Sequence, residues 1–473
     1  MKLIRFFSAA CIMLLLIAAG CAPARAYSLL THEQLIDLAW KGSIVPLLLS
    51  RYPTLTPAQL DEAHAFAYGG CVIQDIGYYP FGDASFSDLT HYVRTGDFVV
   101  SLFRNAQSAD ELAFAVGALS HYIGDSVGHA IATNRAVPVE FPKLAAKYGP
   151  VVNYAEGKHQ HVQTEFAFDI DEIAHHRVAP LRFLRRIGLK VPTKQLALAY
   201  YQTYGLSEDF SARRGRRFNV RSYRFAVRTF IPRIAYAVTL RHRSHEPPEP
   251  DTAEFREIVS EDAAVDKENN WQAYRRKAGF ESYAIAALLF ILPKIGPLKL
   301  VDVKGPTTAT EADYMHSIAL SITILRRVLA RFTPPAAGSA QDGQLPPPPA
   351  ALLSILAATS PDILLRSHDP HHPLPNRDLD TGHVVAPGGY SLTDSTYALL
   401  LHRLAQQPTQ AIPPGLKRDI QAYYADPNAP ITTKKNAALW TQVQADLATL
   451  DGMPTSTELQ PYPTYGQEAE DSQ

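Results

Sequence analysis

Cysteine is scarce in this sequence, with three residues in a chain of 473. So few cysteines exclude a fold that is held together by a network of disulfide bonds. An excess of charge of one sign is also absent, because 45 Lys and Arg residues nearly balance 46 Asp and Glu residues. The net charge of −1 therefore lacks the basic signature of a typical nucleic-acid-binding protein. The chain is long enough for a large hydrophobic core or for two domains.

Long apolar segments are missing as well, and the clearest apolar run lies at the start of the chain. This run, residues 9–19, is shorter than the roughly 20 residues that a membrane-spanning helix needs. It follows the basic residues Lys2 and Arg5 and precedes small residues that end in Ala24-Arg25-Ala26. A basic start, an apolar core and an A-x-A site form the layout of a secretory signal peptide. We therefore predict a signal peptide over residues 1–26.

This prediction makes the protein an exported one, either periplasmic or secreted. An alternative is the segment from Ala18 to Cys21, which resembles a lipoprotein processing site and would leave a lipid anchor on Cys21. The first position of that site is Ala rather than the usual Leu, so cleavage after Ala26 is favoured. No later segment has the pattern of a membrane-spanning helix, and the protein is expected to be soluble or peripheral to a membrane.

The pattern of apolar residues predicts an all-α fold. Apolar residues recur at intervals of three and four, whereas alternating β patterns are rare. Proline-rich stretches interrupt the second half and predict exposed connections. We expect a signal peptide, a first helical domain, a helical extension, a Pro-rich linker, a C-terminal helical region and a disordered tail: residues 1–26, 27–245, 251–333, 334–350, 351–452 and 453–473.

Histidine and carboxylate residues occur at metal-ligand spacings in the first helical domain. His121, Asp125 and His129 form an H-x3-D-x3-H run within a helical pattern. Four residues of an α-helix advance by about 400°, so the three side chains lie along one face, about 6 Å of rise apart. This separation suits two adjacent metal ions with Asp125 as a bridge between them.

A second pair, His161 and Glu165, has the same four-residue spacing and would present both side chains to one ion. A single pair of this kind is weak support, because helical His and Asp residues are usually capping, solvated or hydrogen-bonded groups. Two such clusters close together favour metal binding. Burying several of these groups without partners or metal ions would cost several kcal/mol.

Several segments in the same order and rough spacing resemble a known family. They are Tyr27-Ser-Leu-Leu-Thr-His32, Gly69-Gly-Cys-Val-Ile-Gln-Asp75-Ile-Gly-Tyr-Tyr-Pro80, His91, the run from His121 to His129, and the segment from His161 to Glu165. Together they resemble the zinc-dependent phospholipase C family. That family is related to the fungal zinc single-strand nucleases and to the amino-terminal domain of glycosylphosphatidylinositol-specific phospholipase D. The resemblance implies a mostly helical catalytic domain, here residues 27–245, and a cluster of two or three Zn²⁺ ions.

The resemblance also implies the ligands of each ion. The first zinc ion would have four ligands: Asp75, His91, His121 and Asp125. The second would share Asp125 and would bind His32 together with the free α-amine and carbonyl oxygen of Tyr27, where the family commonly has Trp. The third would bind His129, His161 and Glu165. Asp75 is in addition the candidate base that activates the attacking water. Cleavage after Ala26 would free the amine of Tyr27, whereas a lipid anchor on Cys21 would not.

One spacing departs from the bacterial phospholipases and the nucleases, which have a longer interval between the helix Asp and the next His. The interval between Asp125 and His129 is short, as in the phospholipase D relatives, so the position of the third metal ion is expected to shift. The Glu at position 165 is similar to the residue at that position in the phospholipases, whereas the nucleases tend to have Asp there.

The favoured function is phospholipase C-type hydrolysis of a phospholipid or another phosphodiester, with peripheral membrane contact. The alternatives are a zinc nuclease or nucleotidase, with nucleic acid the less favoured substrate, and a non-catalytic zinc-stabilised envelope protein.

Two further groups of residues leave alternatives open. Four aromatic residues lie near Asp75 in the sequence and would either line an apolar approach to the site or pack in the core: Tyr78, Tyr79, Phe81 and Phe86. The polar, His-rich segment of residues 368–383 favours a turn-rich surface loop. Its alternatives are an additional metal site and a loop packed over the active site. The oligomeric state is not indicated by the sequence.

Overall fold

The structure is a computed structural model, and it describes most of the chain between residues 29 and 456. The described residues are 29–78, 82–210, 224, 225, 227, 228, 231–242, 248–275, 283, 287, 305–332, 372 and 374–456. The predicted signal peptide, the alternative anchor Cys21, the predicted ligand Tyr27 and the Pro-rich linker lie outside these residues, as does most of the predicted tail.

The secondary structure of the described residues is helical and has no strand, apart from two isolated bridges between single residues. The all-α prediction is confirmed. The helical elements of the first part are α2 (Leu29–Ala39), η1 (Trp40–Ile44), α3 (Val45–Arg51), α4 (Pro57–Gly70), η2 (Gln74–Gly77), α5 (Ala84–Tyr92), α6 (Thr95–Arg104), α7 (Ala109–Gly128), η3 (His129–Thr133), α8 (Asn134–Glu140), α9 (Pro142–Tyr148), α10 (Lys158–Ala174), α11 (Leu181–Ile187) and α12 (Thr193–Tyr204). Those of the second part are α14 (Ile231–His242), α15 (Ala253–Asn269), η5 (Trp271–Ala273), α17 (Thr308–Phe332), α20 (Ser391–Ala405), α21 (Pro414–Tyr423), η7 (Thr432–Lys435) and α22 (Ala437–Gly452).

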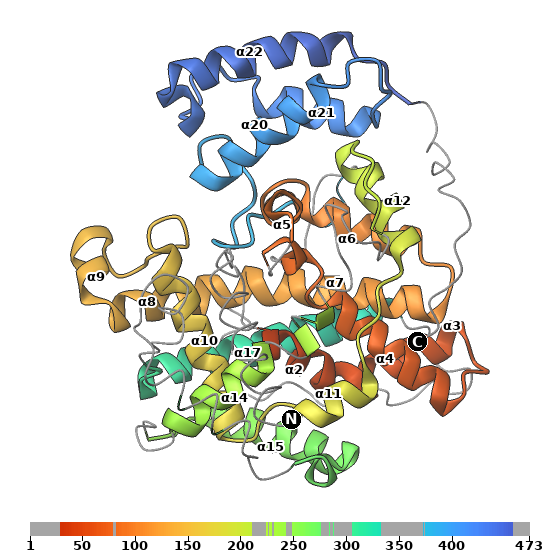
Figure 1. Cartoon of the computed structure of the whole chain (residues 1–473), viewed down its shortest axis with the longest axis vertical. Helices are drawn as coiled ribbons and strands as arrows, with labels where there is room; N and C mark the ends of the chain where they lie inside the picture. Colours follow the sequence, from red (N-terminus) through yellow and green to blue (C-terminus); the bar gives the residue numbers. More distant parts are fainter. Residues whose placement is uncertain are drawn as a thin grey trace, which may run out of the picture.

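The helix α7 is the centre of the fold. Ser108 caps its first turn by accepting a hydrogen bond from the backbone N–H of Glu111 at 3.2 Å. From Ala113 onward every residue of α7 is buried, which is typical of a helix that is surrounded by others. Figure 1 shows α7 crossing the middle of the molecule, with α6 on one side and α2, α4 and α17 on the other, and each of these helices contacts it.

The contact between α4 and α7 brings the two backbones together. A Cβ atom added to Gly117 of α7 would lie 2.3 Å from the Ala67 carbonyl oxygen of α4. A Cβ atom added to Gly70 of α4 would lie 2.1 Å from the Phe114 carbonyl oxygen of α7. Only glycine fits at both positions, so this seam fixes the position of α7 relative to α4.

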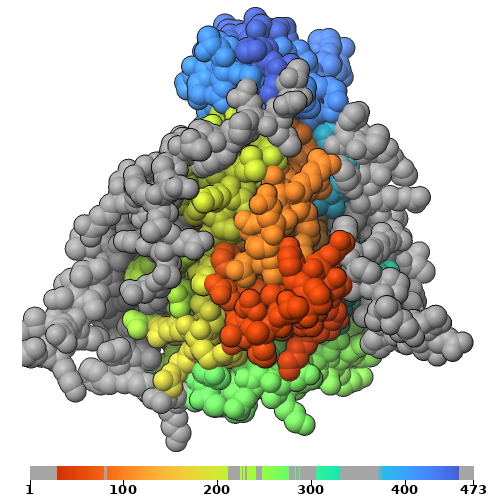
Figure 2. All heavy atoms as spheres, turned by 90° about the vertical axis from the view of Figure 1, so that its right-hand side faces the viewer, coloured from red at the N-terminus to blue at the C-terminus, as the bar shows by residue number. Residues whose placement is uncertain are grey.

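The second part of the chain packs onto the first. The helices α15 and α17 contact α2, and α17 also contacts α7. The helices α20, α21 and α22 form one end of the molecule, as Figures 1 and 2 show in blue, and α20 packs against α5. The domain boundaries expected from the sequence stay a prediction. Among the described residues, no helix is both long enough and apolar enough to cross a membrane.

Candidate metal centre

Six elements bring the predicted ligands together. Their members are His32 on α2, Asp75 in η2, His91 on α5, His121 and Asp125 on α7, His129 at the start of η3, and His161 and Glu165 on α10. All eight side chains are buried. Their donor atoms form three groups in which the atoms lie within 4.8 Å of one another: His32, His121 and Asp125; Asp75, His91 and His121; and His129, His161 and Glu165.

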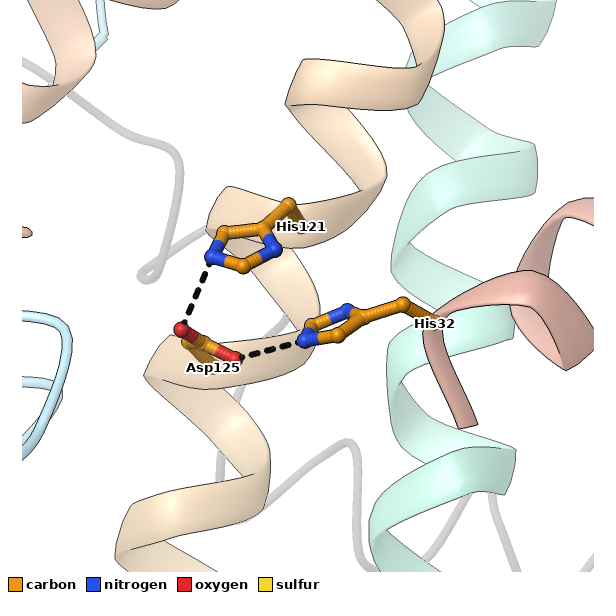
Figure 3. A group of neighbouring side chains, drawn as sticks. All are labelled: His32, His121 and Asp125. Carbon is orange, nitrogen blue, oxygen red and sulfur yellow. Dashed lines mark ion pairs between the residues drawn. The ribbon is translucent and has the colours of Figure 1, made fainter. Parts of the chain in front are cut away.

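Asp125 lies at the centre of the site. Its Oδ2 atom is 3.1 Å from His121 Nε2 and 3.4 Å from His91 Nε2. Its Oδ1 atom is 3.2 Å from His32 Nε2 and 3.8 Å from His129 Nε2. Figure 3 shows Asp125 between His121 of the same helix and His32 of α2, with one oxygen directed at each ring. A carboxylate in this position can bridge two cations, one on each side.

The group around Asp75 completes one side of the centre. Asp75 Oδ1 lies 3.3 Å from His91 Nε2, and His91 Nε2 lies 3.5 Å from His121 Nε2. Two backbone carbonyls fix these rings, because His91 Nδ1 is 2.7 Å from Ser87 O and His121 Nδ1 is 2.9 Å from Cys71 O. A carbonyl oxygen only accepts, so each Nδ1 carries the proton. The Nε2 lone pairs are therefore directed into the site, as in histidines that bind metals.

The third group lies between η3 and α10. His161 Nε2 is 2.9 Å from Glu165 Oε1 and 2.9 Å from His129 Nδ1. His129 Nδ1 is 3.6 Å from the same glutamate oxygen. Burial lowers the pKa of His129, and burial together with His129 lowers the pKa of His161 well below its usual value. Both rings are therefore neutral, which is the form that binds a metal ion.

The negative charge of Asp75 and Asp125 shifts the pKa values of the buried groups in the rest of the site. Burial raises the pKa of Asp75 to about 6. The pKa of Asp125 lies well below its usual value, because His121, His32 and His91 outweigh the effect of burial. Burial would lower the pKa of His91, but Asp125 and Asp75 raise it to about 10. Without a metal ion, His91 therefore also carries a proton on Nε2, the atom whose lone pair would bind a metal ion in its place.

The hydrogen-bonding state of these atoms tests whether a metal ion fits. Asp75 Oδ1, both Asp125 oxygens and His161 Nδ1 are buried and have no hydrogen-bond partner among the described residues. Such groups are costly unless a ligand satisfies them. In two places imidazole nitrogens also face each other, at 3.5 Å and 2.9 Å. A set of imidazole nitrogens and carboxylate oxygens is the donor set that zinc prefers, so zinc fits this site.

The structure brings together eight of the nine residues that the sequence predicted, and Tyr27 lies outside the described residues. Asp75, His91, His121 and Asp125 meet as expected, and His32 meets Asp125. His129, His161 and Glu165 also meet. His129 lies at the start of a widened π-helical turn, with Nε2 towards Asp125 and Nδ1 towards His161.

One residue that supports the site was not predicted from the sequence. Asp169 of α10 accepts hydrogen bonds from the backbone N–H groups of Leu30 and Thr31 at 3.1 and 3.2 Å, and from the Thr31 hydroxyl at 3.2 Å. It thereby holds the first turn of α2, which carries His32. The sequence does contain one signal for Asp169, which is its spacing: His161, Glu165 and Asp169 follow one another at intervals of four residues along one helix.

Two groups that the sequence left open have a defined place. Phe86 is buried and stacks on Tyr200 with ring centroids 5.2 Å apart, and buried Tyr78 donates a hydrogen bond to Asp88 at 3.0 Å. Both side chains pack in the interior, which favours the core alternative, and Tyr79 and Phe81 lie outside the described residues. The surface-loop interpretation of residues 368–383 is wrong for residues 377–380, which are buried. The backbone of this loop packs against the metal centre, as the contact between Leu379 N and His91 O at 3.0 Å shows.

Comparison with known proteins gives one match. Residues 31–206 match the family model described as zinc dependent phospholipase C. No curated protein and no solved structure matches the chain. The matched segment contains all eight of the predicted ligands that the structure describes, and the resemblance inferred from the sequence is confirmed. Residues 31–206 of this protein are therefore similar to the zinc-dependent phospholipase C family, a family of phosphodiester hydrolases.

Proposed function

We propose that this protein is an exported phospholipase C that uses two or three zinc ions to hydrolyse phospholipids. The observation that carries the proposal is the position of Asp125, whose two oxygens face different imidazoles within the segment that matches the family. The reaction would break the bond between phosphorus and the glycerol oxygen. Water would supply a hydroxyl to phosphorus and a proton to the leaving oxygen, which gives diacylglycerol and a phosphorylated headgroup.

Zinc bound here would act as a Lewis acid on the phosphate and would lower the pKa of a coordinated water to about 7. The residues of the chain supply the rest of the chemistry. Asp125 holds the two sides of the centre at a fixed separation. Asp75 would orient the attacking water and accept its proton. The burial of the ligands excludes bulk water and strengthens each electrostatic interaction.

The zinc ions would follow the three ligand groups. The first would bind Asp75, His91, His121 and Asp125, and the third would bind His129, His161 and Glu165. The second would bind His32 and Asp125 together with the amino terminus at Tyr27, which requires cleavage after Ala26. Export through the predicted signal peptide is therefore part of the proposal. Mass spectrometry of the mature amino terminus, together with zinc per chain, tests both points.

The main experiment compares substrates. The purified mature protein, loaded with zinc, is assayed on phosphatidylcholine vesicles and on single-stranded DNA, with an Asp125→Asn variant as the control. Release of diacylglycerol by the wild type alone supports the proposal. Cleavage of DNA without lipid hydrolysis would favour the nuclease alternative. Full zinc content with neither activity would favour a non-catalytic, zinc-stabilised envelope protein.

A further inference from the structure

The helices α8 and α9 and the loop after them form a projection next to the metal centre. This projection consists of residues 134–157, and it joins η3, which begins at His129, to α10, which carries His161 and Glu165. Figure 1 shows α8 and α9 at the left side of the view, where they stand out beyond α10. The projection therefore begins and ends beside the third ligand group.

Contacts at the base of the projection fix it to the metal centre. Tyr154 is buried, and the edge of its ring meets the ring of the ligand His161, with centroids 5.5 Å apart. The His161 N–H donates to the Gly157 carbonyl oxygen at 2.8 Å. The Val152 N–H donates to the Asn134 carbonyl oxygen at 2.8 Å, which joins the two ends of the projection. A partner bound to the projection would therefore be held at a fixed place relative to His161.

The outer part of the projection is apolar and exposed. No residue of α9 is buried. Val139, at the end of α8, is 53% exposed, and Val151, shortly after α9, is 51% exposed. Leu144 and Tyr148 of α9 are partly exposed and lie on one face, since they are four residues apart. A single exposed valine is ordinary on a protein surface, but a helix without a buried residue between two exposed valines is an unpartnered apolar surface.

The 376–385 loop adds a third exposed valine beside the projection. Its Val384 side chain is 57% exposed. The loop meets the projection at Asn134, whose Nδ2 donates to the Asp380 carbonyl oxygen at 2.7 Å. The carbonyl oxygen of the same asparagine accepts from Val152, the residue after Val151. The two exposed valines, Val151 and Val384, therefore belong to segments that meet at one residue.

The charges of the projection are positive on its outside. Lys143 and Lys147 are exposed and four residues apart on α9, and neither forms an ion pair with any residue that the structure describes. Residues 141–155 contain no Asp or Glu. The acid just before them, Glu140, is directed towards α10, where it accepts a hydrogen bond from the Thr164 hydroxyl at 3.0 Å. The outer surface is therefore basic as well as apolar.

We propose that the projection of residues 134–157 docks the protein on a membrane surface that carries anionic phospholipids. Apolar side chains and a tyrosine suit the headgroup region of a bilayer, and lysines there meet the phosphates of the lipids. The inference rests on the proposed function only in the choice of partner, because a phospholipase C has to reach a substrate held in a bilayer. Docking through this surface would hold the third ligand group near the headgroups, since the base of the projection contacts His161.

The test measures the binding of the zinc-loaded mature chain to vesicles by sedimentation on ice, where hydrolysis is slow. The vesicles consist of phosphatidylcholine alone or of an equal mixture of phosphatidylcholine and phosphatidylglycerol. The double variant Lys143→Gln with Lys147→Gln removes the two charges of α9. The control, Lys194→Gln with Lys435→Gln, removes two charges from exposed positions on α12 and η7.

We expect the wild type to bind the mixed vesicles more tightly than the pure ones, and less tightly at high salt. A lysine near an anionic surface contributes about 5-fold to binding, so the α9 variant should bind about 30-fold more weakly than the wild type. The control variant should bind like the wild type. Val139→Ser with Val151→Ser should weaken binding by about 10-fold at low and high salt alike.

Three results would overturn the proposal: no binding of the wild type to the mixed vesicles, wild-type binding by the α9 variant, or equal weakening by the control variant. The first two would leave the projection to a partner other than a membrane. The third would show that overall charge, and not this surface, attracts the protein to the vesicles.

Hydrolysis separates the inference from the proposed function. On dihexanoyl phosphatidylcholine below its micelle-forming concentration, the α9 variant should keep the rate of the wild type, because neither lysine belongs to the metal centre. On mixed vesicles its rate should fall together with binding. A wild type that binds vesicles but hydrolyses neither substrate would contradict the function and support the docking. A wild type that hydrolyses the dispersed lipid but does not bind vesicles would support the function and overturn the docking.

Discussion

The negative charge of two buried clusters of acidic residues is balanced in different ways. In the metal centre, Asp75 and Asp125 face imidazole nitrogens, and several of their oxygens have no hydrogen-bond partner among the described residues. In the second cluster, Arg177 donates to Asp171 at 3.3 Å and to Glu172 and Glu311 at 3.0 Å. The guanidinium in the second cluster occupies the place that a cation would take in the first.

A third cluster follows the pattern of the second. Asp97, His372 and Asp419 could hold a metal ion by distance alone, but Arg94 Nε lies 2.8 Å from Asp97 and 3.1 Å from Asp419. Distances between donor atoms therefore do not separate a metal site from a network of salt bridges. The presence of an internal arginine does, because a buried guanidinium is always charged and repels another cation.

The largest effect is expected from Asp125→Asn. The substitution removes the charge that faces His32, His91 and His121, so the two zinc positions that share Asp125 should be lost. Phospholipid hydrolysis should fall by about 10³-fold, which is comparable with the loss of a main electrostatic group in other active sites. Zinc per chain by elemental analysis and the rate of diacylglycerol release measure both effects. A variant that keeps the zinc content and the rate of the wild type would show that the charge of Asp125 is not balanced by zinc, and the contrast with the Arg177 cluster would fail.

Removal of the internal cation should destabilise the second cluster. Arg177→Met leaves three buried carboxylates without a guanidinium, which should lower the free energy of unfolding by about 3–5 kcal/mol. Urea denaturation measures the change. The control is Arg186→Met, whose pair with Asp61 is exposed and should cost less than about 1 kcal/mol. Tight binding of a divalent cation by the Arg177→Met protein would show instead that the two clusters differ only in what occupies them.

Removal of zinc should lower the stability of the protein through the metal centre and not through the Arg177 cluster. Zinc bound at 100 to 1,000 times its dissociation constant stabilises the folded state by about 2.7–4.1 kcal/mol per site, and a chelator should remove this contribution. Thermal unfolding with and without chelator measures the shift. The shift should be the same in Arg186→Met, and in Asp125→Asn it should fall to the contribution of the third site, which does not include Asp125. An equal shift in Asp125→Asn would place the stabilising zinc elsewhere.

The smallest effect concerns the third cluster and pH. Asp419 and Asp97 raise the pKa of His372 to about 10, compared with about 6.5 for an unperturbed histidine. Since the folded state holds the proton more tightly, the stabilisation is complete below about pH 6.5 and is lost as the pH rises through 10. His372→Gln should therefore show a smaller loss of stability between pH 6 and pH 10 in metal-free protein, measured by urea denaturation. The control His383→Gln, at an exposed position, should behave like the wild type.

The sequence predicted the parts of the centre that depend on local spacing. The four-residue intervals from His121 to His129 and from His161 to Glu165 place side chains on one helical face, and this geometry needs no knowledge of the fold. The resemblance added His32, Asp75 and His91, which come from three other elements. The helical class also followed from periodicity alone.

The rest depends on contacts between distant parts of the chain, which local patterns do not encode. The hydrogen bonds of Asp169 to the first turn of α2 join residues 138 and 139 positions apart. The 376–385 loop looks like a polar surface turn because its Asp residues are polar, yet their partners are buried tyrosines and backbone groups. The widening of the helix at His129 likewise has no clear signal in the sequence.

The glycine seam between α4 and α7 has a consequence for how the protein would take up its metal. Gly70 and Gly117 hold the two helices together before any ion arrives, so α7, which carries His121 and Asp125, keeps its position relative to α4 in the empty protein. Zinc uptake should then order few residues, unlike that of a zinc finger, which folds around its ion. Calorimetry should accordingly find a small change in heat capacity on binding, with most of the entropy coming from released water and protons.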